Sequence, residues 1–357
     1  MEKIRIVVVD DSAFMRKAIS DMIESEDSFE VVAKLRDGRE LIEKVEDINP
    51  DLITLDVHMR DLDGLSTLKE LKRMGKSYPI IMLSSATTEG SEITLECLDN
   101  GAITFINKPS GSISLDIAKI QQRLIDEIKS ITANVKRGKK TSPIMARDNV
   151  KTSINREAEK TNINIPKNKK IDAVVIGAST GGPKALQEVL TKLPKNLGVP
   201  VLVVQHMPEG FTKVFAERLD KVCNLKVVEA KDGMHIDKNT IYIAKGGLHM
   251  KVDNGKNIAL SDDPAIWGVR PAVDKLFDSA IRVYGGNLLS VILTGMGRDG
   301  ADGTRNIKDN GGITIAEDKS TCTIYGMPKA AYETGKVDLV VPLDKISEKI
   351  IEIVQWR

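Results

Sequence analysis

The chain has 357 residues, with 41% hydrophobic and 29% charged residues, so it predicts about two packed domains and excludes collagen, coiled coil and a wholly disordered chain. The 52 Lys and Arg residues nearly balance the 51 Asp and Glu residues, which argues against nucleic acid or an anionic membrane as a general partner. The apolar runs are too short for a membrane span or a signal peptide, so we expect a cytoplasmic protein. The three cysteines are widely scattered, so we expect neither disulfides nor a zinc site.

Residues 1–125 alternate short β-branched runs with segments of helical periodicity. The predicted strands are Ile4–Val9, Glu30–Lys34, Asp51–Leu55, Pro79–Leu83 and Ile103–Asn107. Arg16–Glu24 and Ser91–Asn100 are two of the intervening segments with helical spacing. Five strand–helix units predict a parallel sheet covered on both faces, in an N-terminal domain.

Residues 126–170 are predicted to contain the end of a helix and then a flexible basic linker. Within Lys136–Lys170, eleven Lys and Arg residues stand against three acids, a net of +8. The stretch also lacks aromatic residues and apolar periodicity, so it cannot bury enough surface to offset the entropy of ordering.

A second α/β pattern occupies residues 171–357. Near-continuous apolar runs at Asp172–Ile176, Pro200–Gln205 and Leu288–Leu293 are typical of buried parallel strands. Thr240–Ala244, His249–Val252 and Asn257–Leu260 are predicted as shorter, half-exposed strands around a turn at Asn254-Gly255. We expect a doubly wound, mainly parallel α/β domain with an antiparallel hairpin insertion.

Three acids stand at predicted strand ends of the N-terminal domain. Asp10 and Asp11 follow the first strand and Asp56 follows the third. Carboxyl ends of parallel strands meet at one edge of a sheet, and converging carboxylates favour a hard cation such as Mg²⁺. Ser84 ends the fourth strand and Lys108 the fifth, which adds a hydroxyl and an ammonium to the same edge.

These residues lie in segments that resemble response-regulator receiver domains: VVVDDS, DLITLDVHMRDLDG, IIMLSSA and FINKP. The resemblance implies a flavodoxin-like (βα)5 fold whose Asp56 accepts a phosphoryl group from a histidine kinase. It further implies that Asp10, Asp11, Asp56 and the backbone carbonyl of His58 hold Mg²⁺. Ser84 and Lys108 would bind the added phosphoryl group, and Phe105 would reposition on activation.

A candidate nucleophile follows the first strand of the C-terminal domain. Ser179 lies in Gly177-Ala178-Ser179-Thr180-Gly181, a G-x-S-x-G spacing that precedes a helical segment and suits a raised serine hydroxyl. Of the four histidines, His206 stands at the carboxyl end of the next buried run, whereas His235 and His249 are expected to be structural. Asp299 follows a third buried strand and could orient His206.

The segments IGASTGG, QHMPEGFTKVFAERLD, GVRPAVDKLF, LTGMGRDGADG and YGMPKAA resemble the catalytic domain of chemotaxis protein-glutamate methylesterases. The resemblance implies a Ser179–His206–Asp299 triad and an oxyanion hole formed by backbone amides of Thr180 and Met296. It implies demethylation of glutamyl methyl esters on the cytoplasmic domains of chemoreceptors, with release of methanol and no cofactor for hydrolysis, and deamidation of receptor glutamines. The unphosphorylated N-terminal domain would cover the active site, and a chemotaxis histidine kinase would be the phosphodonor.

Two other functions are compatible with parts of the chain. A DNA-binding regulator would use the basic linker, but it predicts a helix-turn-helix after residue 170, where buried strands are expected instead. A nucleotide-binding module would use Gly177–Gly182 as a phosphate loop, but it requires an acidic ribose partner where the next strand ends in Gln205-His206. We therefore expect no nucleic-acid partner and no membrane insertion.

Overall fold

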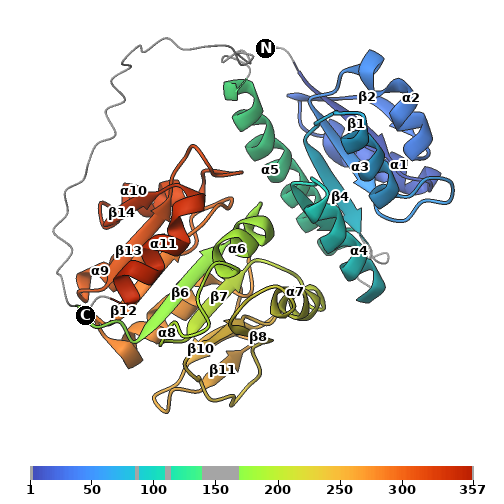
Figure 1. Ribbon diagram of the computed structural model, residues 1–357. Helices are drawn as coiled ribbons and strands as arrows, with labels where there is room; N and C mark the ends of the chain where they lie inside the picture. The colour runs from blue at the N-terminus through green and yellow to red at the C-terminus, as the bar shows by residue number, and fades with distance from the viewer. Residues whose placement is uncertain (1–2, 85–87, 109–113, 139–168, 356–357) are drawn as a thin grey trace, which may run out of the picture.

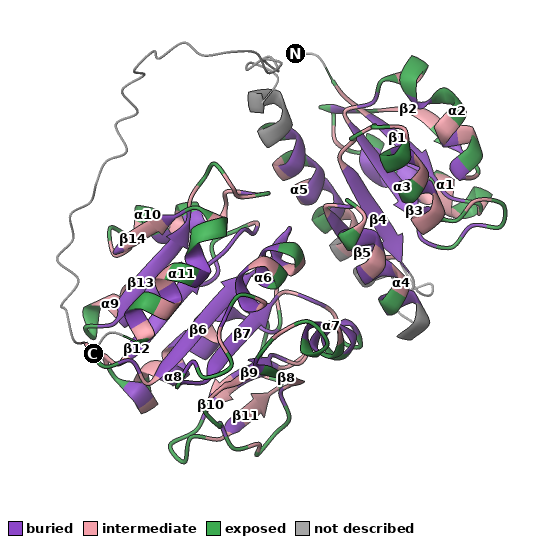
Figure 2. Cartoon of the chain, in the orientation of Figure 1, coloured by how far each residue is buried: buried purple, intermediate pink, exposed green. Residues whose placement is uncertain are grey.

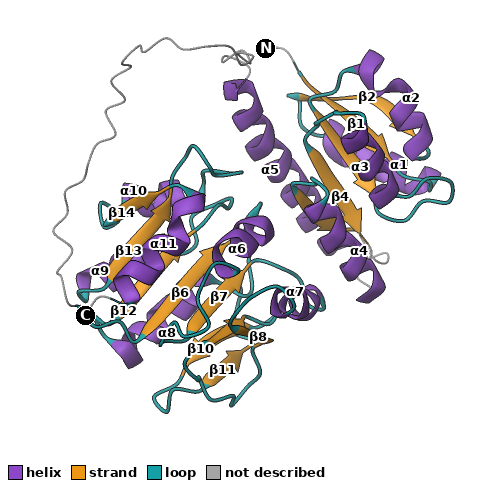
Figure 3. Ribbon diagram, in the orientation of Figure 1, coloured by secondary structure: helices purple, strands orange, loops and turns teal. Residues whose placement is uncertain are grey.

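Two parallel β-sheets, one in each half of the chain, organise the computed structural model of this protein (Figures 1 and 3). The structure describes residues 3–84, 88–108, 114–138 and 169–355. Within those ranges, no helix has the length and apolar character needed to cross a membrane.

The N-terminal domain is a five-stranded sheet of order β2-β1-β3-β4-β5, in which every pairing is parallel. Its strands are β1 (Ile4–Val9), β2 (Phe29–Leu35), β3 (Leu52–Asp56), β4 (Ile80–Ser84) and β5 (Thr104–Asn107). This order is the doubly wound, flavodoxin-like one, so the predicted fold is confirmed. The predicted strand ends differ from the observed ends by at most one residue.

Helices cover both faces of this sheet because successive residues of each strand point to opposite faces. The helices are α1 (Ala13–Glu24), α2 (Gly38–Ile48), α3 (Gly64–Arg73), α4 (Thr88–Asp99) and α5 (Ser114–Gly138). Ile6 and Val8 pack in the apolar cluster that contains α1 and α5, whereas Val7 and Val9 pack in the cluster that contains α2, α3 and α4. The helix α5 continues to residue 138, and the expected flexible segment at 139–168 lies outside the described residues.

The C-terminal domain has a seven-stranded parallel sheet of order β14-β13-β12-β6-β7-β9-β8. Its strands are β6 (Ala173–Ala178), β7 (Val201–Gln205), β8 (Lys226–Glu229), β9 (Thr240–Ile243), β12 (Leu288–Ile292), β13 (Ile313–Glu317) and β14 (Leu339–Val341). A separate antiparallel pair, β10 (His249–Val252) and β11 (Ile258–Ser261), is the predicted hairpin. The predicted mainly parallel sheet with an antiparallel insertion is confirmed.

One strand was predicted in the wrong environment. The segment at β9 was expected to be half-exposed and part of the insertion, but it lies inside the main sheet between β7 and β8. Ile241 and Tyr242 pack in the clusters on opposite faces of the sheet, so both faces of β9 are covered. The Tyr242 hydroxyl is satisfied by the backbone of His235 and Asp237, which allows this polar side chain to be buried.

The helices of the C-terminal domain form two layers around its buried sheet (Figure 2). They are α6 (Gly182–Leu190), α7 (Phe211–Asp220), α8 (Val273–Tyr284), α9 (Ala301–Asp309), α10 (Met327–Glu333) and α11 (Leu343–Val354). Apolar residues of α6, α7 and α11 share one cluster with one face of β6, whereas those of α8, α9 and α10 share the other. The carboxyl ends of β6, β7 and β12 therefore open at one edge, between the two helical layers.

The two domains are in contact. The N-terminal helices α4 and α5 lie on the side that faces the C-terminal domain, and α4 contacts α6 and α7 (Figure 1). The rings of Phe105 and Phe211 stack across the boundary, with centroids 4.4 Å apart and planes inclined by 18°. Asp99 and Arg218 form an ion pair between α4 and α7. Ile324 of the C-terminal domain packs in the same cluster as Leu124 of α5.

Candidate functional site

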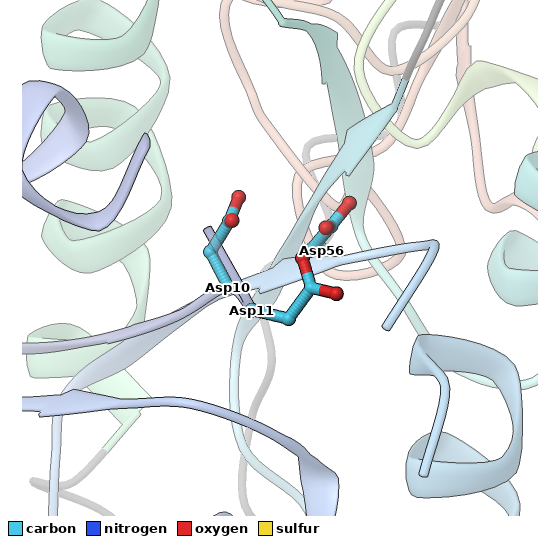
Figure 4. A group of neighbouring side chains, drawn as sticks. All are labelled: Asp10, Asp11 and Asp56. Carbon is cyan, nitrogen blue, oxygen red and sulfur yellow. The ribbon is translucent and has the colours of Figure 1, made fainter. Parts of the chain in front are cut away.

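Three carboxylates meet at the carboxyl edge of the N-terminal sheet (Figure 4). Asp10 and Asp11 follow β1 and Asp56 ends β3, and each offers an oxygen within 4.8 Å of those of the other two. Asp10 and Asp56 are buried. Lys108, just after β5, places its ammonium 2.7 Å from Asp10 and 2.6 Å from Asp56. We call this group of four residues the acidic pocket.

The acidic pocket suits a divalent cation. Burial raises the pKa of the Asp56 carboxyl, even though the Lys108 ammonium lies beside it and acts in the opposite direction. Three carboxylates face Lys108 and, at Asp11, Arg60 at 3.7 Å, so the cluster keeps an excess of one negative charge that a bound cation would offset. Carboxylate oxygens are the ligands that Mg²⁺ prefers, and the described residues therefore fit the predicted metal.

Two further predicted residues lie at strand ends near the acidic pocket. Ser84, the last residue of β4, is fully buried, and its hydroxyl lies 2.6 Å from the Thr94 hydroxyl on α4. The His58 backbone amide donates to Asp56 at 3.2 Å, which places this loop directly against the predicted phospho-acceptor. Phe105 on β5 is not in the pocket, because its ring lies at the domain boundary against Phe211.

A tight turn presents Ser179 between β6 and α6. The Ser179 amide donates to the Thr294 carbonyl at 3.0 Å, and the Gly182 amide donates to the Ser179 carbonyl at 2.7 Å. Gly181 has a φ of +76°, and a β-carbon there would lie 2.5 Å from the Thr323 side chain. Glycine at 181 is therefore required both by the backbone conformation and by the close approach of the neighbouring loop.

His206 and Asp299 form a hydrogen-bonded pair beside this turn. The Nε2 atom of His206 lies 2.8 Å from the Asp299 carboxylate, and the His206 amide donates to the Ala178 carbonyl at the end of β6. Burial would raise the pKa of Asp299, but hydrogen bonds from His206 and from backbone amides of Val273 and Asp274 hold it below its usual value. Asp299 is thus kept as a carboxylate that can stabilise an imidazolium.

A second buried acid accompanies Asp299. Asp274 is the second residue of α8, and its carboxylate accepts hydrogen bonds from the Gly303 amide at 2.7 Å and from Trp267 Nε1 at 3.4 Å. Burial and the neighbouring Asp299 charge raise the pKa of Asp274 to about 7. The two carboxyl groups therefore differ in protonation: Asp299 stays ionised, and Asp274 accepts a proton more readily than Asp299 does.

The amides predicted to form an oxyanion hole belong to residues close to Ser179. Thr180 follows the serine directly, and a β-carbon on Gly295, which precedes Met296, would lie 2.7 Å from the Ser179 β-carbon. In the described part of the chain, the amides of Thr180 and Met296 form no backbone hydrogen bond. Both amides thus remain able to donate to a ligand at this turn.

Thr294 and Glu317 were not predicted, yet they fix the loop that carries Met296. The Thr294 hydroxyl donates to the Thr180 carbonyl at 3.0 Å and accepts from the Ile324 amide at 2.9 Å. The fully buried Glu317 carboxylate accepts the Thr294 amide at 2.8 Å, and burial raises the pKa of Glu317. The position of Thr294 soon after β12 was a sequence signal that could have identified it, whereas Glu317 ends β13, a strand that the sequence did not predict.

The N-terminal domain closes over this turn. Glu127 of α5 accepts hydrogen bonds from the Thr180 hydroxyl at 2.8 and 3.0 Å, and its burial raises the pKa of its carboxyl. The space that remains is a cavity of about 10 Å³, enough for about one water molecule. Its lining includes Phe105, Glu127, Ser179, Thr180 and His206.

The structure brings the predicted residues together in two groups. One group is the acidic pocket with Ser84, and the other is Ser179, His206 and Asp299 with the amides of Thr180 and Met296. His249 is fully buried, accepts the Ala272 amide and faces the Pro264 carbonyl, which agrees with the structural role expected for it. Gln205 was missed by sequence reasoning, although its side chain donates to the Ser179 carbonyl at 3.0 Å.

Comparison with known families gives two matches, one in each domain. Residues 6–119 match the response regulator receiver domain, and residues 174–350 match the CheB methylesterase domain. These matches define the class: a response regulator whose output domain is a hydrolase.

Full-length relatives give a more specific assignment. A protein-glutamate methylesterase/protein-glutamine glutaminase of Clostridium acetobutylicum is 49% identical over 355 residues, covering 99% of each chain. One of the same name from Pyrococcus abyssi is 44% identical, covering 99% of this chain and 94% of that protein. The crystal structure of the Thermotoga maritima CheB methylesterase catalytic domain aligns with a TM-score of 0.50 and 48% identity, over 52% of this chain and all of that one. The chain belongs to the protein-glutamate methylesterase/protein-glutamine glutaminase family.

Proposed function

We propose that this enzyme removes methyl groups from glutamyl γ-methyl esters of chemoreceptor cytoplasmic domains. The observation that carries the proposal is the 2.8 Å hydrogen bond between His206 and Asp299, beside the turn that presents Ser179. A histidine held by a buried carboxylate next to the turn that carries a serine is the arrangement that activates a serine nucleophile.

The reaction would proceed through an acyl-enzyme. Because Asp299 binds Nε2 of His206, Nδ1 is the ring nitrogen that takes the proton as Ser179 Oγ attacks the ester carbonyl. The amides of Thr180 and Met296 would stabilise the oxyanion, and His206 would return the proton to the departing methoxide, which leaves as methanol. Water then attacks the acyl-enzyme, with His206 again as the base, and restores Ser179 with a glutamate product.

The same intermediate supports glutamine deamidation. A primary amide attacked by Ser179 passes through an equivalent tetrahedral adduct, and the leaving group becomes ammonia in place of methanol. Hydrolysis of the resulting acyl-enzyme again gives glutamate. Neither reaction requires a cofactor at the serine site, because the oxyanion donors and the base belong to the chain.

Phosphorylation of Asp56 would control access to the serine. The acidic pocket would hold Mg²⁺ through Asp10, Asp11, Asp56 and the His58 carbonyl, and Mg²⁺ would neutralise charge on the incoming phosphoryl group, donated by a chemotaxis histidine kinase. Ser84 and Lys108 would bind the phosphoryl oxygens. The docked receiver leaves room for about one water beside Ser179, so a protein substrate requires the receiver to move.

We propose that three segments of the chain take part in this control of the active site: a receiver at residues 1–125, a helix end and linker at 126–170, and the catalytic domain at 171–357. Phe105 lies on β5, which pairs with β4 and hence with Ser84, and its ring stacks on Phe211 of the catalytic domain. A phosphoryl group that draws Ser84 toward Asp56 would thus act on an aromatic contact between the domains.

The test is methanol release from a methylated receptor, measured with and without acetyl phosphate and Mg²⁺. We expect stimulated release from the wild type, none from a folded Ser179→Ala variant, and unstimulated basal release from Asp56→Asn. The exposed neighbour Asp61 provides a matched control, since Asp61→Asn should respond like the wild type. An active, folded Ser179→Ala variant would refute the nucleophile, and equal stimulation of Asp56→Asn would refute the phospho-acceptor.

A further inference from the structure

We propose that Trp267 and Arg298 form a docking surface for the acidic protein segment that carries the reacting glutamyl side chain. The inference deepens the proposed function and rests on it. It concerns recognition of the protein around the ester, whereas Ser179, His206 and Asp299 act on the ester itself.

Trp267 is a large apolar side chain held in an exposed position. It is 54% exposed, in a short hairpin closed by a bridge between Ile266 and Val269. Its backbone has a φ of +52°, and the following Gly268 has a φ of +77°, so the turn is tightly constrained. The indole Nε1 donates to Asp274 at 3.4 Å, which further limits rotation of the ring. An exposed aromatic ring fixed before binding loses little entropy on association.

Arg298 lies over this ring and shares its acidic partner with a second arginine. Its guanidinium is 4.8 Å from the centroid of the Trp267 ring, and its side chain is 52% exposed. The acid nearest to it is Asp302 at 3.7 Å, which also pairs with Arg305 at 3.1 Å. Two arginines therefore share one carboxylate, and the 3.7 Å contact with Asp302 leaves N–H donors of Arg298 open to a second carboxylate.

The patch is connected to the triad acid through two routes. Arg298 directly precedes Asp299 in the chain, and Trp267 contacts Asp274, whose amide donates to Asp299 at 3.0 Å. Neither Trp267 nor Arg298 lines the small cavity beneath the receiver, and Trp267 keeps its exposure while the domains are docked. A substrate segment can therefore contact this patch beside Asp299 without first displacing the receiver from it.

The chemistry of the reaction identifies the occupant. Each demethylation or deamidation converts a neutral side chain into a glutamate, so a segment with several modified positions carries carboxylates beside those still to react. A guanidinium in a cation–π contact still has N–H donors for a carboxylate, and the indole face suits the aliphatic stem of a glutamyl side chain. We therefore assign the patch to an acidic segment of the receptor substrate.

The experiment compares two substrates under saturating acetyl phosphate and Mg²⁺: methylated receptor and a small γ-methyl ester of N-acetylglutamate amide. Trp267→Ala and Arg298→Gln should each raise KM for receptor by about tenfold, as residues central to an interface do. Their kcat for receptor and their kcat/KM for the small ester should stay within about twofold of the wild type. Added salt should raise the wild-type KM for receptor more than that of Arg298→Gln.

Three controls separate docking from a structural role. Tyr332→Ala removes another exposed aromatic side chain and Arg282→Gln another exposed arginine, and both should leave KM for receptor unchanged. Trp267→Phe keeps an aromatic face but loses the contact with Asp274, so it should retain most of the receptor affinity.

Unchanged KM for receptor in both Trp267→Ala and Arg298→Gln would overturn the proposal. So would an equal loss on the two substrates, since that would mean that the patch acts by positioning the triad. A wild-type enzyme that releases no methanol from either substrate would instead refute the proposed function, and this inference with it.

Discussion

The stacked rings of Phe105 and Phe211 give a quantitative test of the proposed restraint of the esterase by the receiver. Substituting Phe105→Leu keeps most of the buried apolar surface but removes an aromatic pair with centroids 4.4 Å apart. Such pairs contribute about 0.5–1.5 kcal/mol beyond their buried area. At about 1.4 kcal/mol per tenfold, the ratio of docked to undocked enzyme should fall by about 2- to 12-fold. Because the docked cavity admits about one water, the basal rate should rise by the same factor while undocked enzyme is scarce.

The assay is the initial rate of methanol release from methylated receptor without a phosphodonor. Phe211→Leu should raise this basal rate in the same way. The basal rate of the double variant Phe105→Leu/Phe211→Leu should not rise further through loss of the ring stacking, since either single change already removes the aromatic pair. With acetyl phosphate and Mg²⁺, the rate of Phe211→Leu should match the wild type. Phe29→Leu, in the receiver core, controls for a general loss of receiver stability. Basal rates that stay unchanged in both interface variants would refute the reasoning.

Three more predictions follow from the electrostatics of the two sites. Asp299→Asn should lower kcat by on the order of 10⁴ by disturbing the His206 tautomer, with the melting temperature as a check on folding; a loss below tenfold would contradict the triad. Chelation with EDTA should abolish stimulation by acetyl phosphate but spare the basal rate, and a lost basal rate would place the metal elsewhere. Burial raises the pKa of Glu127 in the docked state, so docking is strongest at low pH and weakens as pH rises through that raised pKa. The basal-to-stimulated ratio should therefore increase with pH and become flat in Glu127→Gln; a flat wild-type profile would count against this contact.

Strands with a nearly continuous apolar run could be predicted from the sequence even where they include a buried polar residue, as β12 does with Ser290, whereas three other strands were missed. The strands β1 and β10 have the predicted bounds. The strand β13 was missed because its ITIAE sequence includes Thr314 and Glu317, which are fully buried only because each finds hydrogen-bond partners in other segments. The edge strands β8 and β14 were also missed, since runs of four and three residues give little periodicity to detect.

The candidate site residues also differ in how far they could be predicted from the sequence. Residues at strand ends could be grouped from sequence, because parallel strands bring their carboxyl ends to one edge. Glu127 could not, since it lies on a helix and is buried by contact with Thr180 of the other domain, more than fifty residues away in the chain. Asp274 and Trp267 were likewise invisible, because their relation to Asp299 depends on how α8 and a hairpin pack around α9.

The cavity beside Ser179 has a thermodynamic consequence for the whole enzyme. Because that space admits about one water, receiver docking and occupation of the serine site by a receptor segment would exclude each other under the proposed function. If phosphorylation favours the undocked state, thermodynamic linkage requires bound substrate to favour phosphorylation by the same factor. Methylated receptor would then act as an effector of its own demethylation, holding the receiver in the form that retains the phosphoryl group. The response of the enzyme would reflect two inputs, kinase output and the number of esters still to be removed.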